Sequence, residues 1–170
     1  MSSLGLEHKE VRLQEYDESW QREYKSEQKK ISSLHYKEFF KVEHVGSTAV
    51  PGMLAKPIID ILIGIGKYKD FKKLIKELET IGYVFHREPR RYQALFLKKS
   101  PKGLTTHHLK IVKYEGKSWN EYIKFRDNLR NNKFLIKEYR KLKLSLVNNK
   151  FDRKAYTKGK NLLIQEILKN

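Results

Sequence analysis

The spacing of apolar and polar residues along this chain predicts the order of its helices and strands. Apolar residues recur at helical spacing in five segments, which span residues 17–35, 68–81, 119–130, 135–148 and 153–168. Short apolar or alternating runs typical of strands occur in five others, which span residues 41–45, 57–65, 83–86, 92–98 and 106–112. Helices cluster at the ends of the chain and strands lie in the middle. This order indicates an α+β domain with a mixed β-sheet flanked by helices and a helical C-terminal third.

One acid interrupts the most apolar of these strands. Residues 57–63 read Pro-Ile-Ile-Asp-Ile-Leu-Ile, a β-branched run that is typical of a strand buried on both faces. An unpaired carboxylate in such a strand is costly. We therefore expect Asp60 to point into a functional site, toward a metal ion or a cation. The structural alternative is an acid that is paired with Lys56 or with an arginine.

A turn of small residues precedes this strand. Gly46-Ser47 offers backbone N–H groups and a hydroxyl at close range, and such turns can hold a phosphate group. Lys56 ends the intervening loop, and we expect it at the mouth of the same pocket. The alternatives are a turn hydroxyl that only caps the following segment and a lysine that is only solvated.

The segment from Glu43 to Ile65 resembles a known family. The sequence GSTAVPG followed by KPIIDI is similar to the motif of the GrpB family, a branch of the nucleotidyltransferase superfamily related to polymerase β. In that superfamily a Gly-Ser turn is followed by an acid-apolar-acid strand. The resemblance extends to further segments, at residues 11–20, 106–109, 125–130 and 155–160. It implies a nucleotidyltransferase-like fold and the transfer of a nucleoside monophosphate with the help of a divalent metal ion.

The acid-apolar-acid element is altered in this chain. Leu62 stands two residues after Asp60, on the same side of the strand, where the resemblance implies a second acid. Two-metal phosphoryl transfer needs carboxylates on both ions. Glu43, shortly before the turn, is the acid that we expect to replace the missing one. Asp60 and Glu43 are thus the predicted catalytic residues and the predicted ligands of a Mg²⁺ or Mn²⁺ ion.

The strand predicted at 106–112 offers cations in place of a third acid. His107 and His108 are adjacent, so they face opposite sides and only one of them can enter a given pocket. If the apolar residues of this strand face the core, His108 and Lys110 share the face toward which Asp60 projects. The residues predicted to bind nucleotide or phosphate are Gly46, Ser47, Lys56, His107, His108 and Lys110.

Length and composition indicate one domain over residues 1–170. The chain of 20.3 kDa contains no linker or repeat. Its longest apolar run is far below the roughly 20 residues of a membrane helix, and residues 1–13 lack the apolar core of a signal peptide. Cysteine is absent, which fits a reducing compartment and excludes disulfides and thiol catalysis. We expect a cytoplasmic protein without membrane contact, and nothing in the sequence specifies its oligomeric state.

The chain is strongly basic. It carries 37 Lys and Arg against 20 Asp and Glu, a formal net charge of +17. Such a charge attracts polyanions, so RNA is a candidate partner, although the sequence contains no recognisable nucleic-acid module. The alternative is that the excess lysines lie on solvated helix faces. The residues that could form a basic patch are Arg87, Arg90, Arg91, Lys98, Lys99 and Lys102.

Three functions remain after these considerations. The first is a nucleotidyltransferase that transfers a nucleoside monophosphate to an unknown acceptor. The second is a nucleotide- or phosphometabolite-binding protein of the same fold with impaired catalysis, for which Leu62 is the main argument. The third is a basic RNA-associated accessory protein.

Tyr156 and Lys160 stand four residues apart on the last predicted helix. We interpret Tyr156 as part of the core and Lys160 as a solvated lysine, with a pair that faces a phosphate as the alternative.

Overall fold

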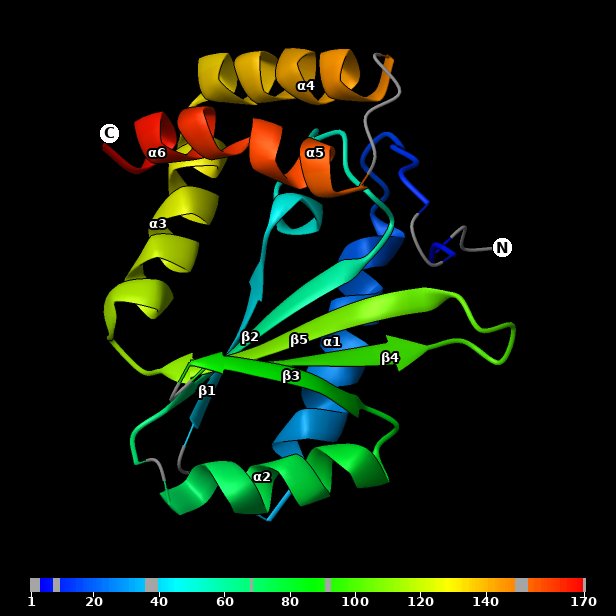
Figure 1. Cartoon of the computed structure of the whole chain (residues 1–170), viewed down its shortest axis with the longest axis vertical. Coiled ribbons are helices and arrows are strands. Elements are labelled where there is room, and N and C mark those ends of the chain that lie inside the picture. Colours follow the sequence, from blue (N-terminus) through cyan, green and yellow to red (C-terminus); the bar gives the residue numbers. More distant parts are fainter. Residues whose placement is uncertain are drawn as a thin grey trace.

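Five strands form one mixed sheet in the computed structural model, which describes residues 4–7, 10–35, 40–67, 69–90, 93–148 and 153–169. The strands are β1 (Phe40–Val45), β2 (Ile59–Ile65), β3 (Val84–Arg90), β4 (Gln93–Lys99) and β5 (Thr105–Lys113). Their order across the sheet is β1-β2-β5-β4-β3 (Figure 1). β2 and β5 are parallel, whereas the other neighbouring pairs are antiparallel. The predicted mixed sheet is therefore confirmed.

The helices are α1 (Ser19–Ser32), α2 (Lys69–Thr80), α3 (Lys117–Asn131), α4 (Lys133–Asn148), α5 (Arg153–Gly159) and α6 (Asn161–Lys169), and a short 3₁₀ helix, η2 (Ser47–Ala49), follows β1. In Figure 1, α4, α5 and α6 gather at the end of the molecule opposite α2. The helical C-terminal third is confirmed. The prediction of a single helix at 153–168 is wrong, because the helix is interrupted at Lys160. The preceding residue, Gly159, has a weak helix propensity.

One face of the sheet carries α1 and α2. The isoleucines at alternate positions of β2 point to this face and are fully buried. Trp20 of α1 and Phe71 of α2 belong to the same cluster. Because side chains alternate along a strand, Asp60 and Leu62 point to the opposite face.

The opposite face carries α3. Trp119 packs there with Leu62 and Val112. Gly64 permits this approach, because a Cβ at that position would lie 2.7 Å from the Trp119 ring. Leu62, where the family resemblance implies an acid, is fully buried in this cluster. Its apolar character is therefore explained by packing.

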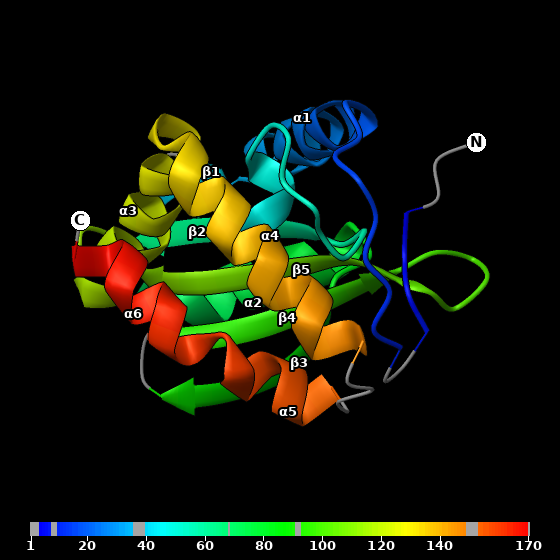
Figure 2. The ribbon, with the colours of Figure 1, turned by 90° about the horizontal axis from the view of Figure 1, so that it is seen from above.

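The C-terminal helices complete the end of the molecule. Figure 2 looks onto α4, α5 and α6, which lie over that end of the sheet. Leu129 of α3, Tyr139 of α4 and Ile167 of α6 form a second apolar cluster with Val50 and Met53 of the loop after η2. This cluster fixes the loop that precedes β2. In the part of the chain that the structure describes, no helix has the length and apolar character needed to cross a membrane.

Candidate functional site

A polar cavity of about 370 Å³ lies on the Asp60 face of the sheet. Its walls come from four strands, from the turn at η2 and from the C-terminal helices. Five of the lining side chains are Lys or Arg and one is an acid. The cavity is therefore strongly positive. The lining residues are Ser47, Thr48, Lys56, Ile58, Asp60, Arg87, Leu95, His108, Lys110, Lys143, Tyr156 and Lys160.

Asp60 faces Lys110 and His108 of β5. Its Oδ1 accepts a hydrogen bond from Lys110 Nζ at 3.1 Å and lies 3.4 Å from His108 Nδ1. The parallel register places Asp60 beside His108, which is the arrangement that strand alternation predicts. Burial raises the pKa of Asp60, but the charge of Lys110 and the hydrogen bond with His108 hold this pKa well below its usual range. The acid is therefore ionised and paired with the Lys110 ammonium group.

Gly46 brings the small-residue turn against this carboxylate. Its φ of +71° lies in the left-handed region that favours glycine. A Cβ at this position would lie 2.7 Å from Asp60 Oδ2. The next residue, Ser47, lines the cavity. The structure therefore brings the Gly46-Ser47 turn and Asp60 together, with Lys56, His108 and Lys110 in the same walls.

Lys143 of α4 is the most buried cation of the cavity, with 2% exposure. Its Nζ donates hydrogen bonds to Ser47 Oγ at 2.7 Å and to the carbonyl oxygen of Leu54 at 2.6 Å. It also lies 4.3 Å from the centroid of the Tyr139 ring. Among the described residues, no carboxylate lies within 4.0 Å of this amine. Burial, and then the charge of Lys160, lowers the pKa of Lys143 well below its usual range.

Lys143 is not among the site residues predicted from the sequence, although α4 contains a signal for it. Tyr139, Lys143 and Leu146 stand at helical spacing i, i+4 and i+7, so they share one face, and all three are buried. A lysine within an apolar helix face is the signal. Arg87 was noted only as part of a surface patch, and no local pattern connects it with Asp60.

Two further lysines flank the ring of Tyr156 in α5. Lys56 Nζ lies 4.5 Å and Lys160 Nζ 4.6 Å from the ring centroid. Tyr156 itself is 1% exposed, as the core interpretation predicts. Burial lowers the pKa of Lys160 to about 8, although the charge of Asp60 raises it. Lys160 is half-buried and lines the cavity, so its interpretation as a lysine that is only solvated is wrong.

His107 does not line the cavity. It points to the face of the sheet that carries α1 and α2, where its ring lies edge-on to Tyr83 and its Nδ1 lies 2.9 Å from Thr106 Oγ1. Burial lowers the pKa of His107 to about 4, so the ring is neutral at pH 7. Because side chains alternate along β5, His108 points into the cavity and His107 points into the core.

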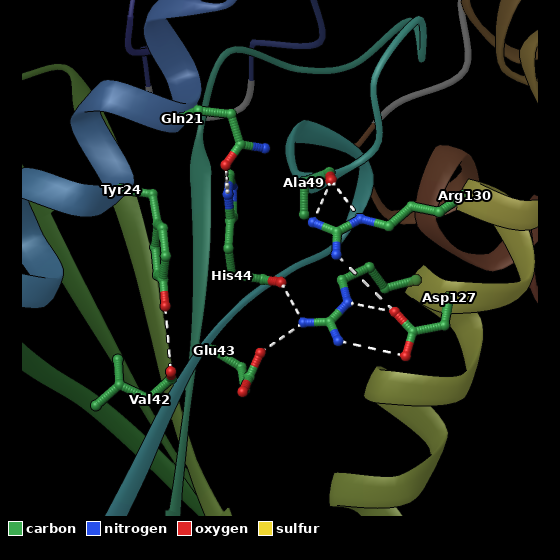
Figure 3. Close-up of polar contacts among 9 residues, drawn as sticks. Gln21, Tyr24, Val42, Glu43, His44, Ala49, Asp127 and Arg130 are labelled. Carbon is green, nitrogen blue, oxygen red and sulfur yellow. Dashed lines mark hydrogen bonds and ion pairs between the residues drawn. The ribbon is translucent and has the colours of Figure 1, made fainter.

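Glu43 also lies outside the cavity lining and is held by α3. Arg126 Nη1 donates hydrogen bonds to Glu43 Oε2 at 2.7 Å and to the carbonyl oxygen of His44 at 3.0 Å. Arg130 donates two hydrogen bonds to the carbonyl oxygen of Ala49, at 2.9 and 2.7 Å (Figure 3). The two arginines therefore fix the backbone on both sides of the Gly-Ser turn. Glu43 belongs to this anchor.

The described residues do not fit a two-metal centre. Asp60 Oδ1 faces Lys110 and His108, and the Glu43 carboxylate is paired with Arg126. Within the described ranges, no three His, Cys, Asp or Glu side chains gather as the ligands of a metal ion would. Two-metal sites rely on several carboxylates. The Mg²⁺ or Mn²⁺ ion stays a prediction, and the side chains near Asp60 supply cations in its place.

The predicted basic patch is divided between the two faces of the sheet. Arg87 lines the cavity, whereas Lys98 points to the other face and pairs with Glu27 of α1 at 2.8 Å. Of the remaining members, Lys99 and Lys102 are exposed, and Arg91 and the side chain of Arg90 lie outside the described residues.

Fold and site together define an α+β protein with a mixed sheet and a cation-lined cavity beside its two parallel strands. Residues 10–170 match the family model described as GrpB protein. The chain therefore belongs to the GrpB family, as the motif around Gly46 and Asp60 implied.

Similar proteins of known sequence or structure agree with this family assignment. "Glutamate-rich protein GrpB" of Alkalihalophilus pseudofirmus is 38% identical over 140 residues, which cover 79% of this chain and 80% of that protein. A UPF0157 protein of Pseudomonas aeruginosa is 39% identical over 119 residues, which cover 68% of this chain and 48% of that protein. The crystal structure of conserved protein GrpB from Enterococcus faecalis matches with a TM-score of 0.83 at 30% identity, over 93% of this chain and 95% of that one. The α+β fold is thus shared with a solved relative.

Proposed function

We propose that this protein binds a nucleotide or another phosphorylated small molecule in the cavity beside Asp60. The charge imbalance of the cavity carries the proposal, since five Lys or Arg side chains face one carboxylate. A phosphate group brings negative charge and several acceptor oxygens, which lysine and arginine bind by charge-assisted hydrogen bonds. The family resemblance supports the same class of ligand.

Lys143 supports the proposal most directly. A buried amine is normally compensated by an acid, because an isolated buried charge is costly. Lys143 has hydrogen-bond acceptors in Ser47 and Leu54 but no carboxylate within 4.0 Å among the described residues. A bound phosphate supplies that charge and stabilises the protonated amine. The Ser47 hydroxyl, which accepts from Lys143, can donate its own hydrogen to the same phosphate.

Calorimetric titration of the whole chain with inorganic tripolyphosphate and with nucleoside triphosphates tests the proposal. We expect saturable binding that Lys143→Met weakens about tenfold or more, because a charge-assisted contact is lost. Lys99→Met is the matched control, since it removes the same charge from an exposed lysine outside the cavity. Equal losses in both variants, or no binding of any of these ligands, would contradict the proposal.

Nucleotidyl transfer is the second candidate function. The contact between Gly46 and the Asp60 carboxylate favours it, together with the family resemblance. The test is incubation with each labelled nucleoside triphosphate, Mg²⁺ or Mn²⁺ and a cell extract. A labelled acceptor that appears with the unaltered chain and not with Asp60→Ala would establish transfer. Saturable nucleotide binding without a labelled acceptor supports a binding protein.

A further inference from the structure

A second, smaller cavity of about 150 Å³ adjoins the first. Arg87, Leu95 and Lys110 line both cavities, so the two lie side by side, and we call them the smaller and the larger lobe. The larger lobe gathers the other lysines and Asp60. The smaller lobe extends toward the start of α3 and has a different chemistry.

Apart from Arg87 and Lys110, which also line the larger lobe, the walls of the smaller lobe are neutral, and this neutral part suits an organic group better than a phosphate. Tyr122 of α3 lies beside Lys110, whose Nζ is 4.8 Å from the centroid of its ring. Gln93 Nε2 donates a hydrogen bond to Ser118 Oγ at 3.0 Å. The amide oxygen of Gln93 is an acceptor and the Ser118 hydroxyl is a donor, so this wall can bond a ligand that has both kinds of group. Leu95 supplies an apolar surface.

The volume sets the size of the group that fits. A cavity of about 150 Å³ is the size that holds one benzene-sized ring. A fused purine is larger than one such ring. The lobe therefore fits one ring with polar substituents.

We infer that the smaller lobe is the subsite for the organic part of the phosphorylated ligand, and that this part is a single polar ring, a pyrimidine base or a sugar. The inference rests on the proposed function, because the phosphates occupy the larger lobe. The ring lies against Tyr122 and directs its polar edge at Gln93 and Ser118. Lys110, on the shared wall, contacts the link between the ring and the phosphates.

A ligand series separates this inference from the proposed function. Tripolyphosphate, UTP and ATP carry the same number of phosphates, so their affinities for the whole chain compare no organic group, a sugar with a single-ring base and the same sugar with a fused-ring base. We expect UTP to bind about tenfold tighter than tripolyphosphate, a difference typical of a pocket that fits one ring. A similar advantage of UTP over ATP assigns the lobe to the base, and equal affinities of UTP and ATP assign it to the sugar. UMP and ribose 5-phosphate then distinguish the base from the sugar. Equal affinities of UTP, ATP and tripolyphosphate would overturn the inference and leave the proposed function standing.

Variants of Tyr122 give a second readout. Tyr122→Leu should weaken UTP or UMP binding about tenfold by loss of ring stacking, and it should leave tripolyphosphate binding unchanged. Tyr122→Phe keeps the ring and should restore most of the affinity. Glu121→Gln, the adjacent change on α3, lies outside both lobes and is the matched control. An equal loss for tripolyphosphate, or the same loss in the control, would overturn the subsite. Absence of binding for every ligand would overturn both this inference and the proposed function.

Discussion

Each face of the sheet holds a lysine that is at least half-buried, and the two lysines differ in the groups that surround their amines. On the face of α1 and α2, Lys98 Nζ lies 2.8 Å from Glu27 Oε2, 3.0 Å from the carbonyl oxygen of Ile81 and 5.1 Å from the centroid of the Tyr83 ring. On the other face, Lys143 has a carbonyl oxygen, a hydroxyl and a tyrosine ring as neighbours. The carboxylate is the difference between the two sites.

Under the proposed function, this difference separates a charge that serves the fold from one that binds the ligand. The charge of Lys98 is balanced within the fold, since Glu27 also accepts hydrogen bonds from Tyr83 and Lys30. Burial raises the pKa of Glu27, but the hydrogen bonds from Lys30 and Lys98 lower this pKa by more than burial raises it, so the acid stays ionised. In the proposed function, the charge of Lys143 is balanced by an anion that enters the cavity.

Removal of the balancing acid should have the largest effect. Glu27→Leu leaves Lys98 and the Tyr83 hydroxyl without their partner, so we expect the free energy of unfolding to fall by about 3 kcal/mol, with phosphate affinity unchanged. Urea unfolding measures the loss. Glu79→Leu, a change at an exposed acid of α2, is the control. A loss no greater than that of the control would show that the Lys98 site is not balanced in this way.

Removal of Lys143, the lysine without a carboxylate partner, should change the free energy of unfolding in the opposite direction. Lys143→Met replaces a buried amine by an apolar side chain of similar length, so we expect the free energy of unfolding to rise by about 1 kcal/mol or to stay unchanged. Urea unfolding without ligand is the measurement. If this variant is strongly destabilised while Glu27→Leu is not, the comparison between the two lysines fails.

Asp60→Asn tests whether the acid serves a metal or the charge balance of the cavity. If Asp60 only balances cations, removal of its charge should tighten tripolyphosphate binding about fivefold, because a like charge is lost near the ligand. Titrations with and without Mg²⁺ measure the change. A Mg²⁺ effect that is present in the unaltered chain and disappears in Asp60→Asn would instead assign Asp60 to a metal.

The smallest effect concerns pH. Lys160 has a pKa of about 8 in the folded chain, so its charge is lost as pH rises through 8, and phosphate affinity should fall about twofold to threefold. Lys160→Arg keeps its charge, so this fall should vanish. Stability has the opposite trend. The unfolded chain binds more protons at Lys160 between pH 8 and its ordinary pKa of 10.5, so the free energy of unfolding should rise across that window. Calorimetry and urea unfolding at several pH values check both trends.

Local sequence patterns predicted much of the fold and the group of site residues around Asp60. The isoleucines of β2 alternate strictly around Asp60, so the acid had to face a different environment from theirs. The same alternation on β5 places His108 and Lys110 with Asp60. These predictions succeed because the period of a strand fixes which side chains share a face.

The remaining site residues come from long-range packing. The sequence does not show that Arg126, far along the chain, reaches Glu43 and removes it as a free ligand. Lysines are also common on α4 and α5, and spacing alone does not say which of them a neighbouring helix covers. Lys143 and Lys160 are brought to Asp60 by the way the C-terminal helices lie over the sheet, which no short segment encodes.

The parallel pairing of β2 with β5 has a consequence for the order of folding. β3, β4 and β5 are consecutive antiparallel strands, so they can pair as soon as their short turns form. β2 meets β5 only after the whole intervening segment has closed as a loop, and contacts of this kind form slowly. Asp60, His108 and Lys110 therefore come together late. A ligand that needs all three recognises the finished fold, so it should slow unfolding and leave the folding rate unchanged.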